Sequence, residues 1–277
     1  MRYGIVINSE QCIGCYNCFL TCQDEFCGNT YEGYSAAAPL QGHNWMRVLD
    51  LERGQYPRVK VAYIPKTCMH CEDAKCVAAA ENGAVYRRPD GIVIIDPVKA
   101  RGQKQLVNAC PYRVIEWNEE AQLPQKCNLC AHALDKGEKV PRCVESCPIN
   151  AIVFGDLDDP ASEISQVMKQ GATEPLRPEF KLQEKVRYIG LPKRFVAGTV
   201  VLKDKSECAH NAEVELSNGK ETRKTTTNMF GDFEFEGLEA NQTFHLKVRQ
   251  PGYKEKKLRC ATVTDSHVGE IVLSPKL

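Results

Sequence analysis

The chain has 277 residues, with 36 basic and 36 acidic side chains and 15 cysteines. This length allows more than one domain, and the balanced charge indicates neither a nucleic-acid partner nor an acidic lipid surface. No stretch approaches the roughly 18 apolar residues of a membrane-spanning helix, and the first residues lack a signal-peptide pattern. We therefore expect a cytoplasmic chain without direct membrane insertion, whose cysteines stay reduced as metal ligands. Export with a signal-bearing partner is the alternative.

A short apolar strand, residues 3–8, leads into four closely spaced cysteines: Cys12, Cys15, Cys18 and Cys22. This spacing is typical of a [4Fe–4S] loop, in which three cysteines bind one cube and the fourth binds another. Gly14 allows the backbone to pass close to the cube because it has no Cβ. The alternative is a zinc loop or a disulfide scaffold, although zinc sites usually use two separated pairs of ligands.

The next stretch carries little periodic signal. Residues 23–25 continue a polar helix, and residues 28–58 are predicted to form an irregular surface excursion, one that contacts another subunit. Cys27 lies outside the cysteine loop and is expected to be a structural thiol.

The second cysteine group, Cys68, Cys71 and Cys76, provides three ligands and has Ala80 where a fourth would stand. Cys110, directly before a proline, has the form that closes a ferredoxin loop. The group of three and the single cysteine together supply the four ligands of one cluster, so we expect them to bind the same cube.

The third group consists of Cys127, Cys130, Cys143 and Cys147. Alone, these two separated pairs are also compatible with a four-thiolate zinc site. Beside the first loop they supply the ligands that it lacks, so the sequence predicts three [4Fe–4S] clusters. The predicted ligands are set 1 (Cys12, Cys15, Cys18, Cys147), set 2 (Cys127, Cys130, Cys143, Cys22) and set 3 (Cys68, Cys71, Cys76, Cys110).

Residues 1–160 resemble the iron–sulfur subunits of the molybdopterin oxidoreductases related to dimethyl sulfoxide reductase. The resemblance includes residues that are not ligands, at 68–71, 90–93, 109–112 and 154–156. That family usually carries four clusters, and here all four ligand positions of one cluster hold other residues: Ala80, Ala100, Gln103 and Leu106. The resemblance therefore implies that one whole cluster is missing.

The C-terminal part differs in pattern. After a helix predicted from Asp159 (cap) to before Gly171 and an extended linker, around seven short alternating strands begin near Phe195, with turns at 218–219 and 251–252. They predict a small immunoglobulin- or prealbumin-like β-sandwich. The predicted fold is α+β, with a ferredoxin-type domain (1–160), a helix and linker (161–194) and a β-sandwich domain (195–277).

This combination resembles, more narrowly, the small subunits of pyrogallol–phloroglucinol transhydroxylases. The resemblance implies an electron-transfer subunit in a heterodimer with a large catalytic subunit, which holds a bis-molybdopterin cofactor with molybdenum or tungsten and acts on polyhydroxylated aromatics. The alternative is a subunit of a respiratory molybdopterin enzyme that exchanges electrons with an external carrier. We find no catalytic residue in this chain.

Residues beside the predicted ligands set cluster properties. Lys126 and Arg142 either favour the reduced clusters or are ordinary solvated charges, and His70 and His132 are expected to pack near the clusters without binding iron. Apolar neighbours are expected to exclude solvent: Ile13, Leu129 and Ile149. Cys208 and Cys260 are expected to be reduced core thiols, and Trp45 and Trp117 to be core or interface residues.

Overall fold

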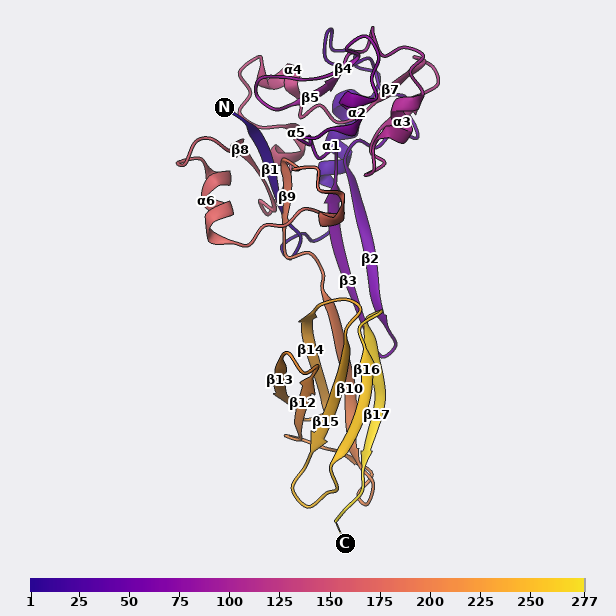
Figure 1. The fold of residues 1–277 in the computed structure, drawn as a ribbon, viewed down its shortest axis with the longest axis vertical. Helices are drawn as coiled ribbons and strands as arrows, with labels where there is room; N and C mark the ends of the chain where they lie inside the picture. The colour runs from indigo at the N-terminus through magenta and orange to yellow at the C-terminus, as the bar shows by residue number, and fades with distance from the viewer. Residues whose placement is uncertain (277) are drawn as a thin grey trace. The chain divides into compact units, whose positions relative to one another are not determined.

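A computed structural model describes residues 1–276, which form two compact units (Figure 1). The first unit comprises Met1–Asp50 and Tyr63–Leu191, and the second comprises Leu51–Ala62 and the residues from Pro192 onward. In the described residues, no helix is long and apolar enough to cross a membrane.

A three-stranded sheet anchors the first unit. Strand β1 (Tyr3–Asn8) lies between β8 (Ile152–Asp156), which is antiparallel to it, and β9 (Val186–Ile189), which is parallel. Four consecutive apolar or glycine positions of β1 are buried, as expected for a central strand. The region predicted as a linker thus contributes β9 to this sheet.

Short elements surround this sheet. The predicted helical stretch is part of α1 (Asn17–Phe26), which starts within the first cysteine loop. The other helices are α2 (Lys75–Ala78), α3 (Gln105–Ala109), α4 (Ala131–Leu134), α5 (Arg142–Glu145), α6 (Glu163–Gln170) and the 3₁₀ turn η1 (Pro178–Phe180). Two small hairpins complete the unit: β4 (Val85–Arg87) with β5 (Val93–Ile95), and β6 (Glu116–Asn118) with β7 (Leu123–Gln125).

Two sequence predictions need correction. Residues 28–58 are not irregular throughout, because β2 (Arg47–Gln55) and β3 (Arg58–Lys66) form a long hairpin. No residue of β2 is buried, so its strand lacks the inside–outside alternation that marks a half-buried sheet. Helix α6 is capped by Ser162, whose hydroxyl accepts from the N–H of Ser165, and not by Asp159.

The second unit contains two four-stranded sheets. In one, β10 (Arg194–Leu202) pairs with β11 (Glu207–Cys208), β14 (Asp232–Leu238) and, in parallel, β17 (Ser266–Leu273). The other has the order β13 (Thr222–Thr226), β12 (Glu213–Ser217), β15 (Thr243–Arg249), β16 (Lys256–Ala261).

Side chains from both sheets form one core. Val196, Val200 and Phe235 come from the first sheet, and Leu216 and Phe244 from the second. The alternation that indicated strands in the sequence thus directs one apolar row from each sheet inward.

The end of the β2–β3 hairpin, residues 51–62, belongs to the second unit and forms ion pairs with it. Arg58 and Lys60 pair with Glu234, and Lys60 also pairs with Glu236. The Lys60 ammonium lies 5.2 Å from the ring centroid of Phe195, at a distance suited to a cation–π interaction.

We predict that Gly231→Ala destabilises the second unit more than Gly219→Ala. Both glycines have positive φ, 77° and 84°, which costs about 1–2 kcal/mol for alanine. A Cβ at Gly231 would lie 2.4 Å from the carbonyl oxygen of Val200, whereas one at Gly219 meets no described atom within 4 Å. Calorimetric unfolding of the full chain checks this, and equal losses would contradict it.

Candidate iron–sulfur sites

The set 1 thiols come from both ends of the first unit. Cys12, Cys15 and Cys18 follow β1, whereas Cys147 follows α5 and precedes β8. Because β8 pairs with β1, residues far apart in sequence meet here. Burial raises the pKa of the Cys18 thiol to about 12, and the charges of Cys12, Cys147 and Cys15 contribute to the rise. Set 1 is thus brought together around one space.

Set 2 lies deeper in the same unit. Burial raises the pKa of the Cys22 thiol far above its ordinary value, and Cys127, Cys143 and Cys130 add to the rise. Cys18 of set 1 also raises the pKa of Cys143 through its charge. Sets 1 and 2 are therefore neighbours.

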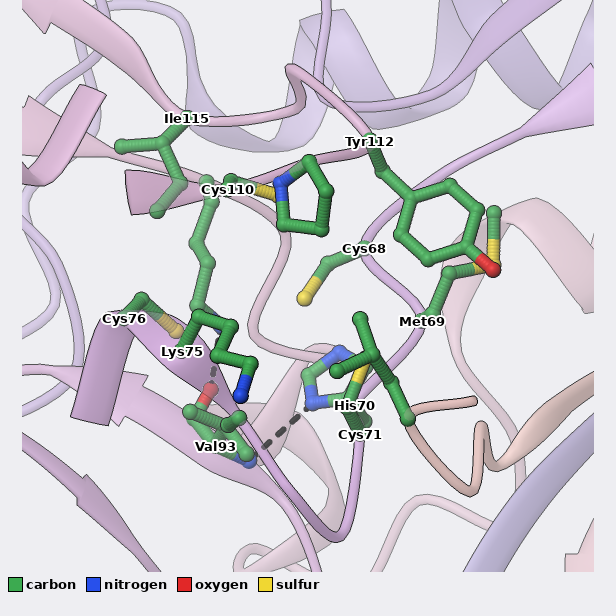
Figure 2. Close-up of a pocket in the computed structure, with 14 residues that line it drawn as sticks. Cys68, Met69, His70, Cys71, Lys75, Cys76, Val93, Cys110, Tyr112 and Ile115 are labelled. Carbon is green, nitrogen blue, oxygen red and sulfur yellow. Dashed lines mark hydrogen bonds between the residues drawn. The ribbon is translucent and has the colours of Figure 1, made fainter. Parts of the chain in front are cut away.

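Set 3 surrounds a small apolar hollow, shown in Figure 2. Cys68, Cys71, Cys76 and Cys110 all line it, together with residues such as Tyr112 and Leu182. Burial raises the pKa of Cys76 to about 11, although the positive charge of Lys126 acts in the opposite direction. The charge of Cys68 also raises the pKa of Cys127 in set 2, so sets 2 and 3 are neighbours as well.

The donor chemistry of the three sets fits iron–sulfur clusters. Each set offers four thiols, all cysteines of the chain are free, and thiolate is the ligand that such clusters take. In the described part of the chain, no group of three or more His, Cys, Asp or Glu side chains is arranged to hold a single metal ion. Ligands of one zinc ion, each about 2.3 Å from it, stand closer together than the thiolates of a four-iron cube.

The buried side chain of Lys126 also fits the presence of iron–sulfur clusters at these thiols. Lys126 is 4% exposed, and its ammonium donates to the carbonyl oxygens of Val93 and Cys127. Burial lowers its pKa, but the thiolates of Cys68, Cys76 and Cys127 outweigh this, so the pKa lies above its ordinary value. An uncompensated buried charge is costly, and the negative charge of thiolates that bind a cluster would stabilise the Lys126 ammonium. It is not an ordinary solvated lysine.

Arg142 belongs to a network that the sequence did not reveal. Its Nε donates to Glu25, which also accepts from Tyr31 and from His132 Nε2 at 2.8 Å each. Burial raises the pKa of Glu25, and these hydrogen bonds outweigh it and hold the pKa below its ordinary value. Tyr31 also stacks on the imidazole of His132, with ring centroids 3.6 Å apart. Tyr31 and Glu25 carry no sequence signal, because only the fold brings them to His132.

His70 is fully buried among the set 3 cysteines. Its Nδ1 accepts the N–H of Val93, which leaves the proton on Nε2, an atom without a hydrogen-bond partner in the described residues. Tyr112 and Glu184 were also missed: the Tyr112 hydroxyl donates to Glu184, and the Glu184 charge acts on Cys71.

Solvent exclusion follows the prediction only in part. Leu129 is 2% exposed, but Ile13 is 61% exposed and Ile149 is 36% exposed. Cys15 is itself exposed, so this part of set 1 lies at the surface of the described chain, beside the exposed Ile13. Trp45 is buried and Trp117 half-buried.

The expectation that Cys208 and Cys260 are both core thiols is right for only one of them. Cys260 is buried in the sandwich, but Cys208, on the two-residue strand β11, is exposed. Cys27 is half-buried.

The positions at which the resemblance predicts a missing fourth cluster belong to a small core. Ala100 and Leu106 are fully buried beside Val85 and Ile95. Gln103 hydrogen-bonds the backbone N–H and carbonyl of Glu81 and the carbonyl of Lys99. Apolar packing and one side-chain amide thus hold this loop.

Fold and donor sets together define an iron–sulfur protein with an added β domain. Residues 59–157 match the 4Fe–4S dicluster domain, and residues 196–273 match the carboxypeptidase regulatory-like domain. The pyrogallol hydroxytransferase small subunit of Pelobacter acidigallici is 41% identical, over 91% of this chain and 92% of that protein.

Other relatives match most of their own length but less of this chain. The arsenate respiratory reductase iron–sulfur subunit of Shewanella sp. is 31% identical over 68% of this chain and 96% of its own length. A Halobacterium salinarum protein named for the iron–sulfur subunit of a dimethyl sulfoxide reductase is 36% identical, over 68% and 79% respectively. The chain belongs to the family of oxidoreductase iron–sulfur subunits that includes these proteins, and it is an electron-transfer subunit.

We predict that Gly14→Ala disrupts the set 1 loop and lowers bound iron by about four per chain. A Cβ at Gly14 would lie 2.5 Å from the ring of Tyr63, so the ring or the loop must move. Gly28→Ala is the matched control, because φ is also positive there and no described atom lies within 4 Å of the added Cβ. Iron analysis of anaerobically purified protein checks this, and equal iron in both variants would refute it.

Proposed function

We propose that this chain binds three [4Fe–4S] clusters through sets 1, 2 and 3 and transfers electrons for a molybdopterin-dependent catalytic subunit. The substrate class we propose is polyhydroxylated aromatics such as pyrogallol, in a transhydroxylation. The observation that carries the substrate class is the relative named for pyrogallol, which matches 91% of the chain and therefore includes the C-terminal unit.

The residues of this chain have no catalytic role in that reaction. When bound, each cube supplies a site that gains or loses one electron. The chain binds the cubes by thiolates and excludes water around set 2, where every thiol is buried. Backbone N–H groups also donate to ligand sulfur, Leu129 to Cys127 at 3.4 Å and Ala151 to Cys147 at 3.3 Å. Such bonds favour the more negative, reduced cluster.

Transhydroxylation of one aromatic ring by another is redox-neutral overall, so no external electron carrier is needed in each turnover. We therefore propose that the clusters store electrons and reset the molybdenum or tungsten site of the large subunit. The proposed complex is cytoplasmic and is a heterodimer of this chain with that subunit.

A respiratory role is the second candidate. It is favoured by the relatives named as reductase subunits, which match this chain over most of their own length. In that case the complex would reduce or oxidise its substrate only with an external carrier. Activity of the purified complex with pyrogallol and an aromatic acceptor, without any added electron carrier, would separate the two.

Iron, acid-labile sulfide and zinc in one anaerobic sample test the clusters. We expect about twelve irons and twelve sulfides per chain and no stoichiometric zinc. About eight irons with one zinc would overturn the assignment of set 2 and the remote pairing of Cys22 and Cys147.

We predict that Cys147→Ser lowers bound iron and removes one of three reduced-state EPR signals, because set 1 loses its distant ligand. Cys27→Ser is the control, since this half-buried thiol belongs to no set. Unchanged iron and spectra in Cys147→Ser would contradict the predicted pairing.

A further inference from the structure

Lys126 occupies a position between two of the thiol sets. It follows strand β7 and directly precedes Cys127 of set 2, while its side chain lines the set 3 hollow together with Cys68 and Cys76. Cys76 of set 3 is also among the charges that act on it. A single cation thus faces thiolates of both sets.

Hydrogen bonds to the backbone of Val93 fix the position of the Lys126 side chain and of the neighbouring His70. The peptide of Val93 on β5 donates its N–H to His70 Nδ1 at 3.0 Å and accepts from Lys126 through its carbonyl oxygen. The bond between Val93 and His70 is drawn in Figure 2, beside Cys68 and Cys71. One strand residue therefore fixes both the buried cation and the buried imidazole at set 3.

The charge of Lys126 is not neutralised by a carboxylate. Within residues 1–276 it forms no ion pair with Asp or Glu, and its ammonium donates to two carbonyl oxygens, those of Val93 and Cys127. Arg142 beside set 2 differs, because it pairs with Glu25 and Glu145. Charges that act on the set 1 thiols Cys12 and Cys18 come from other cysteines.

The charges around set 3 oppose each other in part. Glu184 acts on Cys71 and makes an added electron there less favourable. The Lys126 charge acts on three set 3 thiols, those of Cys68, Cys76 and Cys110, and its side chain lines the hollow between them. Glu184 is as buried as Lys126, so solvent screens neither charge, but Glu184 acts on one set 3 thiol whereas Lys126 acts on three.

We propose that Lys126 is the shared counter-cation of the set 2 and set 3 clusters and raises the reduction potential of the set 3 cluster most. The inference rests on the proposed clusters. Adding one electron makes a cluster more negative, and the fixed ammonium stabilises that state without any transfer of a proton.

The test is an EPR-monitored redox titration of the purified complex, with dithionite as reductant. We expect Lys126→Met to lower the equilibrium constant for reduction of the set 3 cluster at least tenfold, which is about 59 mV for one electron. The set 2 cluster shifts less, and the set 1 cluster does not shift. The spectrum of Cys76→Ser assigns the set 3 signal.

Lys75→Met is the matched control, because Lys75 is also next to a set 3 cysteine and lines the hollow but is exposed. Lys126→Arg keeps the charge and is expected to restore the potential. If Lys126→Met with full iron shifts the set 3 potential no more than Lys75→Met does, the inference is wrong.

Lys126→Gln keeps a donor without the charge and replaces the Met variant if that variant loses iron. Loss of iron in the Met, Gln and Arg variants alike would also overturn the inference, since packing and not charge would then be responsible. Fewer than three clusters in the unmodified complex would overturn the proposed function instead, which keeps the two failures distinct.

Discussion

Burial of charged sulfur is the constraint on which the first unit depends. Set 2 has every thiol buried, and the pKa of Cys22 and of Cys143 lies far above that of a free thiol. Thiolates stay there only when positive charge, iron or a cation, is placed beside them. Set 2 draws Cys22 from α1 and Cys143 from α5, so a cluster bound there would also fasten α1 to α5. The short helices around them have little stability of their own.

The surroundings of the three sets differ in a way that suits electron transfer. Set 1 lies at the surface with Cys15 exposed, set 2 is enclosed, and set 3 shares the Lys126 cation with set 2. Neighbouring sets act on each other through Cys18 and Cys143 and through Cys68 and Cys127. Charge, burial and hydrogen bonds to sulfur are the means by which a protein sets cluster potentials, and all three vary along this row.

The second unit is stabilised differently. Its core consists of apolar side chains from two sheets and contains a single cysteine, Cys260. A sandwich of this kind depends on hydrophobic burial and strand pairing, and needs no metal. The pyrogallol hydroxytransferase relative matches 91% of this chain, whereas the other two relatives match 68% of it.

The sequence by itself predicted the cysteine sets, the absence of one cluster and the succession of two units, because ligand spacing and strand alternation are local patterns. It also indicated β1 and most sandwich strands. Tertiary structure alone decided that Lys126 is buried between two sets, that Glu25 joins Tyr31, His132 and Arg142, and that Ile13 and Cys208 are exposed. The burial of a charge and the partners of a carboxylate depend on residues distant in the chain, and no local pattern encodes which of them fold together.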